Sequence, residues 1–171
     1  RWTVAGIGAL FSVNHPKESG PPWLFDELFD PDCIEVWSAP WFLSNYQALA
    51  LWDRLLREGR RVTAVGGSDK HQSPFSGELG WYEVGTPTTW VWAGELSVPA
   101  VIDGLRSGRV FISEGPEGPQ VELRAHRGTE QAMMGDALGV VPGERILLIC
   151  RVHGAAGALL RMVSAQRTLQ V

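Results

Sequence analysis

The chain has 171 residues, of which 44% are hydrophobic and 20% are charged, and its formal net charge is −4. This composition is typical of a globular protein of one substantial domain or slightly more, and it excludes a disordered chain. No apolar stretch approaches the roughly 20 residues of a membrane-spanning helix, and the acidic balance offers no basic surface for nucleic acid, so we expect neither a membrane nor nucleic acid as partner.

The first half of the chain alternates segments typical of strands and of helices. An uninterrupted apolar run from Ala9 to Val13 predicts a strand, and Cys33 to Trp37 predicts the next one. Continuous apolar runs are expected of strands that are covered on both faces. The segment between them, Lys17 to Asp32, is rich in Pro, Gly and aromatic residues. We expect it to form a packed loop with a short helical turn beside the site.

Helical spacing of apolar residues predicts a helix from about Tyr46 to Glu58. Ser44 or Asn45 can cap its start, and Gly59 can close it in the left-handed conformation. A strand from Arg61 to Gly66 follows.

A second helix is predicted after Ser97, which can cap it, and Gly108 closes it. The strand Arg109 to Ser113 comes next. This order of strands and helices implies parallel strands, whose carboxyl ends usually carry the ligands.

The pattern changes after residue 115, where apolar and polar residues alternate and Gly and Pro separate the segments. We therefore predict two units, residues 1–115 with α/β character and residues 116–171 as a small antiparallel β domain. His126 and His153 fall in the second unit, where we expect surface or edge-strand positions. The predicted β segments lie at 121–125, 144–152 and 158–163.

Two histidines of the first unit directly follow predicted strands. His15 lies in Asn14-His15-Pro16, and His71 ends Gly66-Gly67-Ser68-Asp69-Lys70-His71. On an extended chain Asp69 and His71 point the same way, with α-carbons about 6 to 7 Å apart. Imidazole and carboxylate together suit zinc, manganese or iron. The chemistry this pattern predicts is metal-assisted hydrolysis.

Each motif also has a simple structural interpretation. Asn14-His15-Pro16 can be a turn, because Asn bonds its own backbone and the residue before Pro is held extended. Ser68 or Asp69 can cap a helix that carries Lys70 and His71 in its solvated first turn. Because two of only four histidines follow strands in this way, their joint occurrence favours a site.

These motifs resemble those of the PHP (polymerase and histidinol phosphatase) superfamily of metallohydrolases, specifically its CehA/McbA-like branch. The resemblance covers almost the whole chain. It implies an α/β fold, namely the C-terminal part of a distorted (β/α)7 barrel followed by a small antiparallel β appendage. The matching segments are Leu10 to Pro16, Gly66 to His71, Gly85 to Val91 and Ser97 to Ser113.

The resemblance implies that His15, Asp69 and His71 are metal ligands, with Asp69 and His71 also catalytic. It further implies hydrolysis of a phosphoester, or of a related aryl or carbamate ester, with two or three zinc, manganese or iron ions in an intact parent protein. Members of the family open with a His-x-His strand, and this chain contains none. We therefore expect the other ligands upstream of Arg1. This expectation leaves the localisation open.

The only two lysines, Lys17 and Lys70, lie within two residues of a proposed ligand histidine. They either hold an anionic phosphate or point into solvent, and both alternatives stay open. Among the eight tryptophans, one or two can line an aromatic subsite while most belong to the core. Glu35 and Glu78 are nearby acids that can orient a ligand histidine.

A second class of function stands beside the hydrolase. A half barrel exposes strand edges that favour pairing with the missing N-terminal half or with a second copy. The chain would then be a catalytically inactive scaffold or interaction module.

Overall fold

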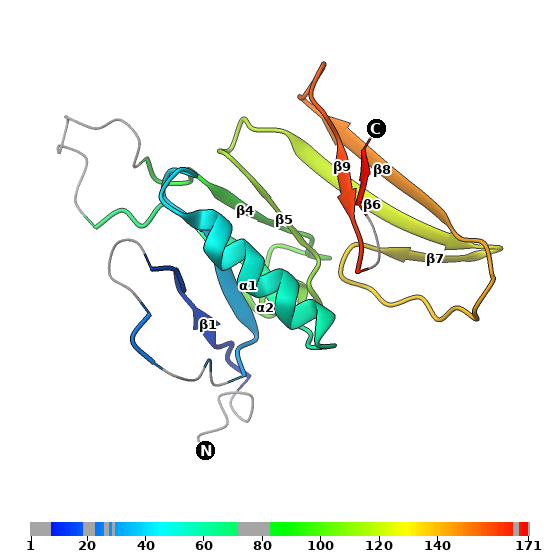
Figure 1. The fold of residues 1–171 in the computed structure, drawn as a ribbon, viewed down its shortest axis with the longest axis horizontal. Coiled ribbons are helices and arrows are strands. Elements are labelled where there is room, and N and C mark those ends of the chain that lie inside the picture. The colour runs from blue at the N-terminus through cyan, green and yellow to red at the C-terminus, as the bar shows by residue number, and fades with distance from the viewer. Residues whose placement is uncertain are drawn as a thin grey trace.

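The structure is a computed structural model that describes residues 8–18, 23–25, 28, 30–71, 83–165 and 168–170. Its first sheet is parallel, and its strand order is β1–β2–β3 (Figure 1). The register places Glu35 opposite Val65 and Val13 opposite Ile34, so the strands end along one edge of the sheet. The three strands are β1 (Ser12–Val13), β2 (Cys33–Ser38) and β3 (Thr63–Gly67).

The helix α1 (Asn45–Arg57) packs across β2 and confirms the first predicted helix. The indole N–H of Trp52 donates a 2.8 Å hydrogen bond to the carbonyl of Val62, which ties the helix to the strand that follows. Ser44 precedes the helix at φ 59° and gives it no side-chain cap. The buried core between sheet and helix consists of Val13, Ile34, Val36, Leu55 and Val62.

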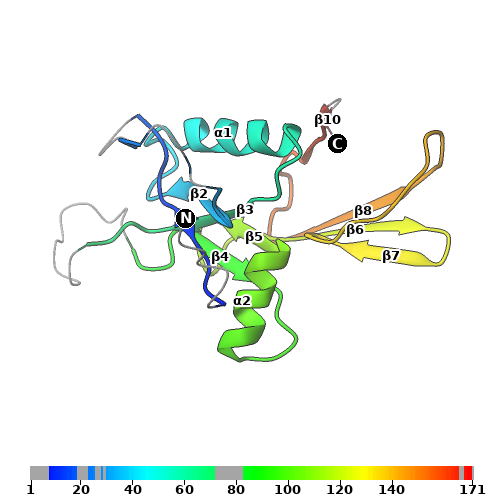
Figure 2. The same ribbon diagram turned by 90° about the horizontal axis from the view of Figure 1, so that it is seen from below.

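The next part of the chain is an antiparallel pair, β4 (Thr88–Val91) and β5 (Val110–Ser113), joined through α2 (Val98–Ser107). Ser97 caps α2 as predicted, because its Oγ accepts a 3.3 Å hydrogen bond from the N–H of Ala100. Figure 2 shows α1 and α2 on opposite sides of these strands.

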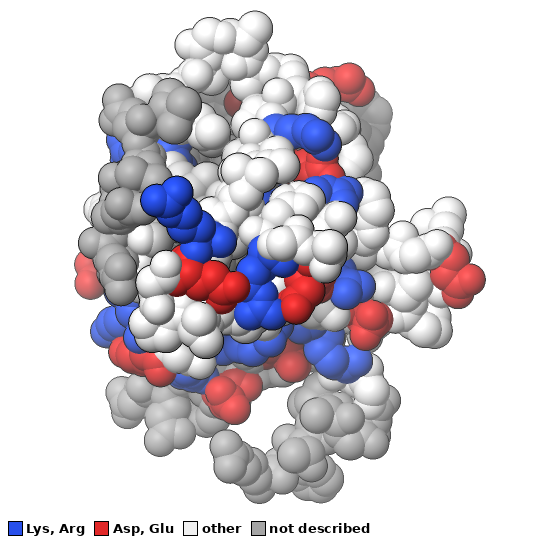
Figure 3. All heavy atoms as spheres, turned by 90° about the vertical axis from the view of Figure 1, so that its right-hand side faces the viewer, with Lys and Arg blue, Asp and Glu red and all other residues white. Residues whose placement is uncertain are grey.

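The C-terminal part is antiparallel β, with a three-stranded sheet in the order β7–β6–β8 that extends away from both helices (Figure 2). Figure 3 shows acidic and basic side chains side by side on this side of the molecule. The described sheets hold β6 (Gln120–Arg127), β7 (Glu130–Met133), β8 (Leu147–His153), and the separate pair β9 (Arg161–Val163) and β10 (Thr168–Gln170).

The predicted (β/α)7 half barrel is wrong. The described strands form four small sheets of two or three strands, with two short helices and no closed barrel. The strand at Val110–Ser113 exists, but it pairs with β4 in antiparallel fashion and does not extend the parallel sheet. At the outer edge of β3, the hydroxyl of Thr89 both accepts from the N–H of Gly66 and donates to its carbonyl, at 2.7 and 2.8 Å. The Thr89 side chain therefore makes the two hydrogen bonds at Gly66 that a further parallel strand would otherwise make.

Within the part of the chain that the structure describes, neither helix is long and apolar enough to cross a membrane.

Candidate metal site

The site forms where β1, β2 and β3 end. Because the strands are parallel, the residues that follow β1 and β3 lie at the same edge of the sheet. Glu35 of β2 connects them: its Oε2 accepts a 3.0 Å hydrogen bond from the backbone N–H of His15. A Cβ placed on Gly67 would lie 3.0 Å from the other oxygen, Oε1. The carboxylate thus lies between the turn after β1 and the end of β3.

Asp69 and His71 are brought together as the sequence predicted. The distance from Asp69 Oδ1 to His71 Nε2 is 2.8 Å, and the exposed fractions of the two side chains are 34% and 77%. Asp69 adopts φ 52°, so the pair meets through a left-handed residue and not through an extended chain. No helix begins within residues 68–71, which removes the helix-cap interpretation for that stretch. The pair is open to solvent, and its carboxylate and imidazole hydrogen-bond to each other.

His15 follows β1 with φ 36°, a conformation that is uncommon for a residue other than glycine. Its N–H bond to Glu35 holds this turn. The backbone thus turns at His15, although His15 is not extended as predicted, and its imidazole has no hydrogen-bond partner among the described residues.

The two lysines differ in their surroundings. Lys17 is buried, and its Nζ lies 3.3 Å from Asn45 Oδ1 and 3.5 Å from the carbonyl of Ser38. Burial lowers the pKa of Lys17, against the opposing charges of Glu35 and Asp69. The Lys17 ammonium therefore faces the start of α1 and not solvent.

Lys70 is largely covered and forms an ion pair. Its Nζ is 3.4 Å from Glu83 Oε2, and its side chain is 13% exposed. Lys70 lies between Asp69 and His71 in the sequence, and its charge is paired with that of Glu83.

From the sequence, Glu35 was expected only to orient a ligand histidine and was not among the predicted ligands. It is 7% exposed, and burial raises its pKa to about 7. The charge of Asp69 adds to this rise, while the N–H of His15 and the charge of Lys17 oppose it. The available signal was a carboxylate inside an otherwise apolar strand, because acidic side chains are rarely buried. Glu78, the other acid considered, lies outside the described residues.

The titration of Glu35 predicts how stability depends on pH. The folded-state pKa of about 7 lies above the ordinary 4.5, so the folded protein retains a proton that the unfolded chain releases. The resulting stabilisation is complete below the ordinary value and is lost as the pH rises through about 7, a loss of roughly 3 kcal/mol. Urea unfolding at pH 5, 6, 7 and 8 should show this decline in the wild type and a flatter profile in Glu35→Gln.

The matched control for that experiment is Glu58→Gln, since Glu58 is an exposed acid at the end of α1. Its profile should follow the wild type. Equal pH slopes in the wild type and Glu35→Gln would contradict the assignment.

The donor chemistry of the pair fits zinc, manganese or iron. Among the described residues, however, no three His, Cys, Asp or Glu side chains are grouped so that they could hold a metal ion. The pair Asp69–His71 supplies two donors, fewer than the three protein ligands of a catalytic zinc site. The ligand set His15, Asp69 and His71 stays a prediction.

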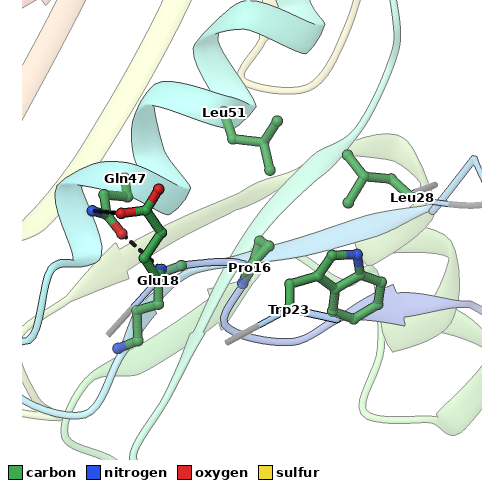
Figure 4. Close-up of a pocket in the computed structure, with 7 residues that line it drawn as sticks. Pro16, Glu18, Trp23, Leu28, Gln47 and Leu51 are labelled. Carbon is green, nitrogen blue, oxygen red and sulfur yellow. Dashed lines mark hydrogen bonds between the residues drawn. The ribbon is translucent and has the colours of Figure 1, made fainter. Parts of the chain in front are cut away.

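A cavity of about 270 Å³ lies beside the turn that carries His15 (Figure 4). Gln47 of α1 bonds across it, because its Oε1 accepts from the N–H of Glu18 at 2.8 Å. The indole nitrogen of Trp23 is buried there and has no hydrogen-bond partner among the described residues. The start of the predicted packed loop therefore lies against α1. The lining residues are Pro16, Lys17, Glu18, Trp23, Leu28, Gln47 and Leu51.

Comparison of the chain with models of protein families, with curated proteins and with solved structures gave no match.

Proposed function

We propose that this chain is part of a metal-dependent hydrolase that acts on phosphoesters or on related aryl or carbamate esters. The observation that supports it best is the exposed Asp69–His71 pair, 2.8 Å apart, directly after a parallel strand. Ligands commonly bind at this edge of parallel α/β sheets, and carboxylate with imidazole is a common donor set for catalytic metals.

In this proposal His15, Asp69 and His71 bind zinc, manganese or iron, and the further ligands of a two- or three-metal site come from outside the described residues. Such an ion lowers the pKa of bound water to about 7 and polarises the substrate oxygen. Asp69 also accepts a proton from the attacking water. Lys70 exchanges its partner Glu83 for the anionic part of the substrate. Lys17, proposed from sequence for the same role, instead positions the turn after β1 through its contact with Asn45.

The first test is elemental analysis of the chain purified without chelator, together with Asp69→Asn. Loss of the carboxylate charge should lower bound zinc, manganese or iron about tenfold or more, since removal of a metal ligand costs at least as much as the 10- to 100-fold loss seen for outer-shell partners. Hydrolysis of bis(p-nitrophenyl) phosphate by the metal-loaded chain should fall with the metal content.

The matched control is His126→Ala, because His126 lies on β6, away from the sheet that carries the site. This variant should keep the wild-type metal content. A metal content that Asp69→Asn leaves unchanged, or that His126→Ala lowers as much, would contradict the proposed site.

A second candidate is a catalytically inactive scaffold or interaction module that pairs with another protein or with a second copy of this chain. The observation in its favour is that the described residues provide a pair of donors and no larger group. A metal-free chain that self-associates in solution would favour this function over the hydrolase.

A further inference from the structure

A second cavity, of about 410 Å³, lies between the β4–β5 pair and the β6–β7–β8 sheet. This volume is within the range of small-molecule sites, which often occur where two units of a protein meet. It is separate in composition from the candidate metal site, because none of His15, Glu35, Asp69 or His71 lines it.

The walls of this cavity are aromatic and sulfur-containing. The rings of Trp90 and Phe111, which face each other across β4 and β5, are stacked with centroids 5.7 Å apart and planes 8° from parallel. Trp92 is 59% exposed at the opening. Met133, the last residue of β7, and Met134, which follows it, also line the cavity. Flat aromatic faces and adaptable thioethers favour a flat, apolar ligand.

Both charged side chains among the described lining residues, Arg109 and Glu122, form ion pairs. Arg109 lies 2.9 Å from Asp136, and Glu122 forms ion pairs with Arg124 and Arg151. Since the charged side chains in the wall are already paired, an ionic ligand would gain little and would lose its hydration. An uncharged ligand therefore suits this lining better than an ionic one.

Two polar side chains at the cavity have no hydrogen-bond partner among the described residues. Gln120 of β6 and His153 of β8 lie directly opposite each other in the antiparallel register, so their side chains are neighbours on one face. Both are exposed, and neither side chain hydrogen-bonds to any residue that the structure describes. A carboxamide and an imidazole side by side can donate to, and accept from, one hydroxyl group.

The two walls are held in place by a tight contact. Gly135, at φ 87°, approaches Gly108 so closely that a Cβ on it would lie 2.4 Å from the Gly108 carbonyl carbon. The Arg109–Asp136 ion pair and a 3.0 Å hydrogen bond from Arg61 to the carbonyl of Gly135 lie at the same junction. The cavity is thus preformed, which lowers the entropic cost of binding.

We propose that this cavity binds an uncharged, flat aromatic molecule with one hydroxyl substituent, of the phenol class. The aromatic ring lies against Trp90, Trp92 and the methionines, and the hydroxyl group bonds to Gln120 and His153. The proposal does not depend on the hydrolase function.

The test uses the uncharged fluorescent dye prodan, whose emission shifts to the blue in an apolar site. The wild type should bind it saturably, and Trp92→Ala should weaken binding about tenfold, since one aromatic wall is lost. Trp41→Ala removes another partly exposed tryptophan, which lies outside this cavity, and should leave binding unchanged. Far-UV circular dichroism checks that both variants fold.

A second measurement addresses the hydroxyl group. p-Cresol should displace prodan at about a tenfold lower concentration than toluene, which has the same ring without the hydroxyl. In the Gln120→Leu, His153→Leu double variant this preference should disappear while prodan still binds. The proposal fails if the wild type gives no saturable blue shift, if Trp92→Ala and Trp41→Ala behave alike, or if the double variant keeps the preference for p-cresol.

Discussion

Replacing Asn45 with alanine is expected to lower the free energy of unfolding by roughly 3 to 5 kcal/mol, because buried polar partners lose their hydrogen bonds. The Asn45 side chain is fully buried. Its Oδ1 accepts from the N–H of Ser38 at 2.8 Å and from Lys17 Nζ at 3.3 Å. Its Nδ2 lies 3.0, 2.9 and 3.2 Å from the carbonyls of Ser38, Pro40 and Trp41. The amide therefore holds the turn between β2 and α1.

Urea unfolding of Asn45→Ala measures this loss. The matched control is Gln47→Ala, which removes a carboxamide from the same helix. The hydrogen bonds of the Gln47 side chain to Glu18 are exposed to solvent. Exposed hydrogen bonds are replaced by water, so the control should lose about 1 kcal/mol or less. Equal losses in the two variants would show that the buried network adds nothing to stability.

Replacing Gly135 with alanine is expected to cost roughly 3 kcal/mol or more. Part of the cost is the φ of 87°, which disfavours any side chain. The rest is steric, because the new Cβ would lie 2.4 to 2.6 Å from backbone atoms of Gly108 and Arg109. Neither backbone can move without disturbing the junction between α2 and the β6–β7–β8 sheet.

Gly143→Ala separates the two contributions. Gly143 has nearly the same φ, 89°, but a Cβ there would have no heavy atom of the described structure within 4 Å. Thermal unfolding should show a loss of about 1 to 2 kcal/mol for Gly143→Ala and a clearly larger one for Gly135→Ala. If the two variants unfold at the same temperature, the close approach of Gly135 to Gly108 adds no steric cost to the substitution.

Local patterns in the sequence predicted the elements better than their arrangement. The segment Cys33 to Trp37 and the helix from about Tyr46 were found because apolar runs and helical spacing depend on neighbours in the chain. The strand β1 is only Ser12–Val13, shorter than the apolar run that predicted it. Sheet pairing depends on contacts between distant residues, which periodicity does not contain.

The antiparallel pairing of β4 and β5 shows this limit. The order of helices and strands favoured a parallel crossover through α2, and the strand at Thr88–Val91 was not predicted as such. The resemblance that suggested a barrel rested on short motifs, and short motifs do not determine how a sheet closes.

For the site, the spacing of Asp69 and His71 predicted their proximity because two residues apart is a local relation. The surroundings of Lys17 and Glu35 could not be predicted in the same way. Lys17 contacts Asn45, 28 residues away, and Glu35 contacts His15, 20 residues away. Burial and pKa depend on such distant contacts, so the sequence left the role of both residues open.

The Thr89 hydroxyl at Gly66 has a consequence for assembly. An unpaired strand edge is a template for another strand, and here the edge of β3 is closed at Gly66 by a side chain that satisfies both its N–H and its carbonyl. Among the described strands, the edge of the parallel sheet that stays available is that of β1. A strand from another segment or another chain that adds to this sheet would therefore dock next to the turn that carries His15, and would bring its own side chains to the edge where Asp69 and His71 lie.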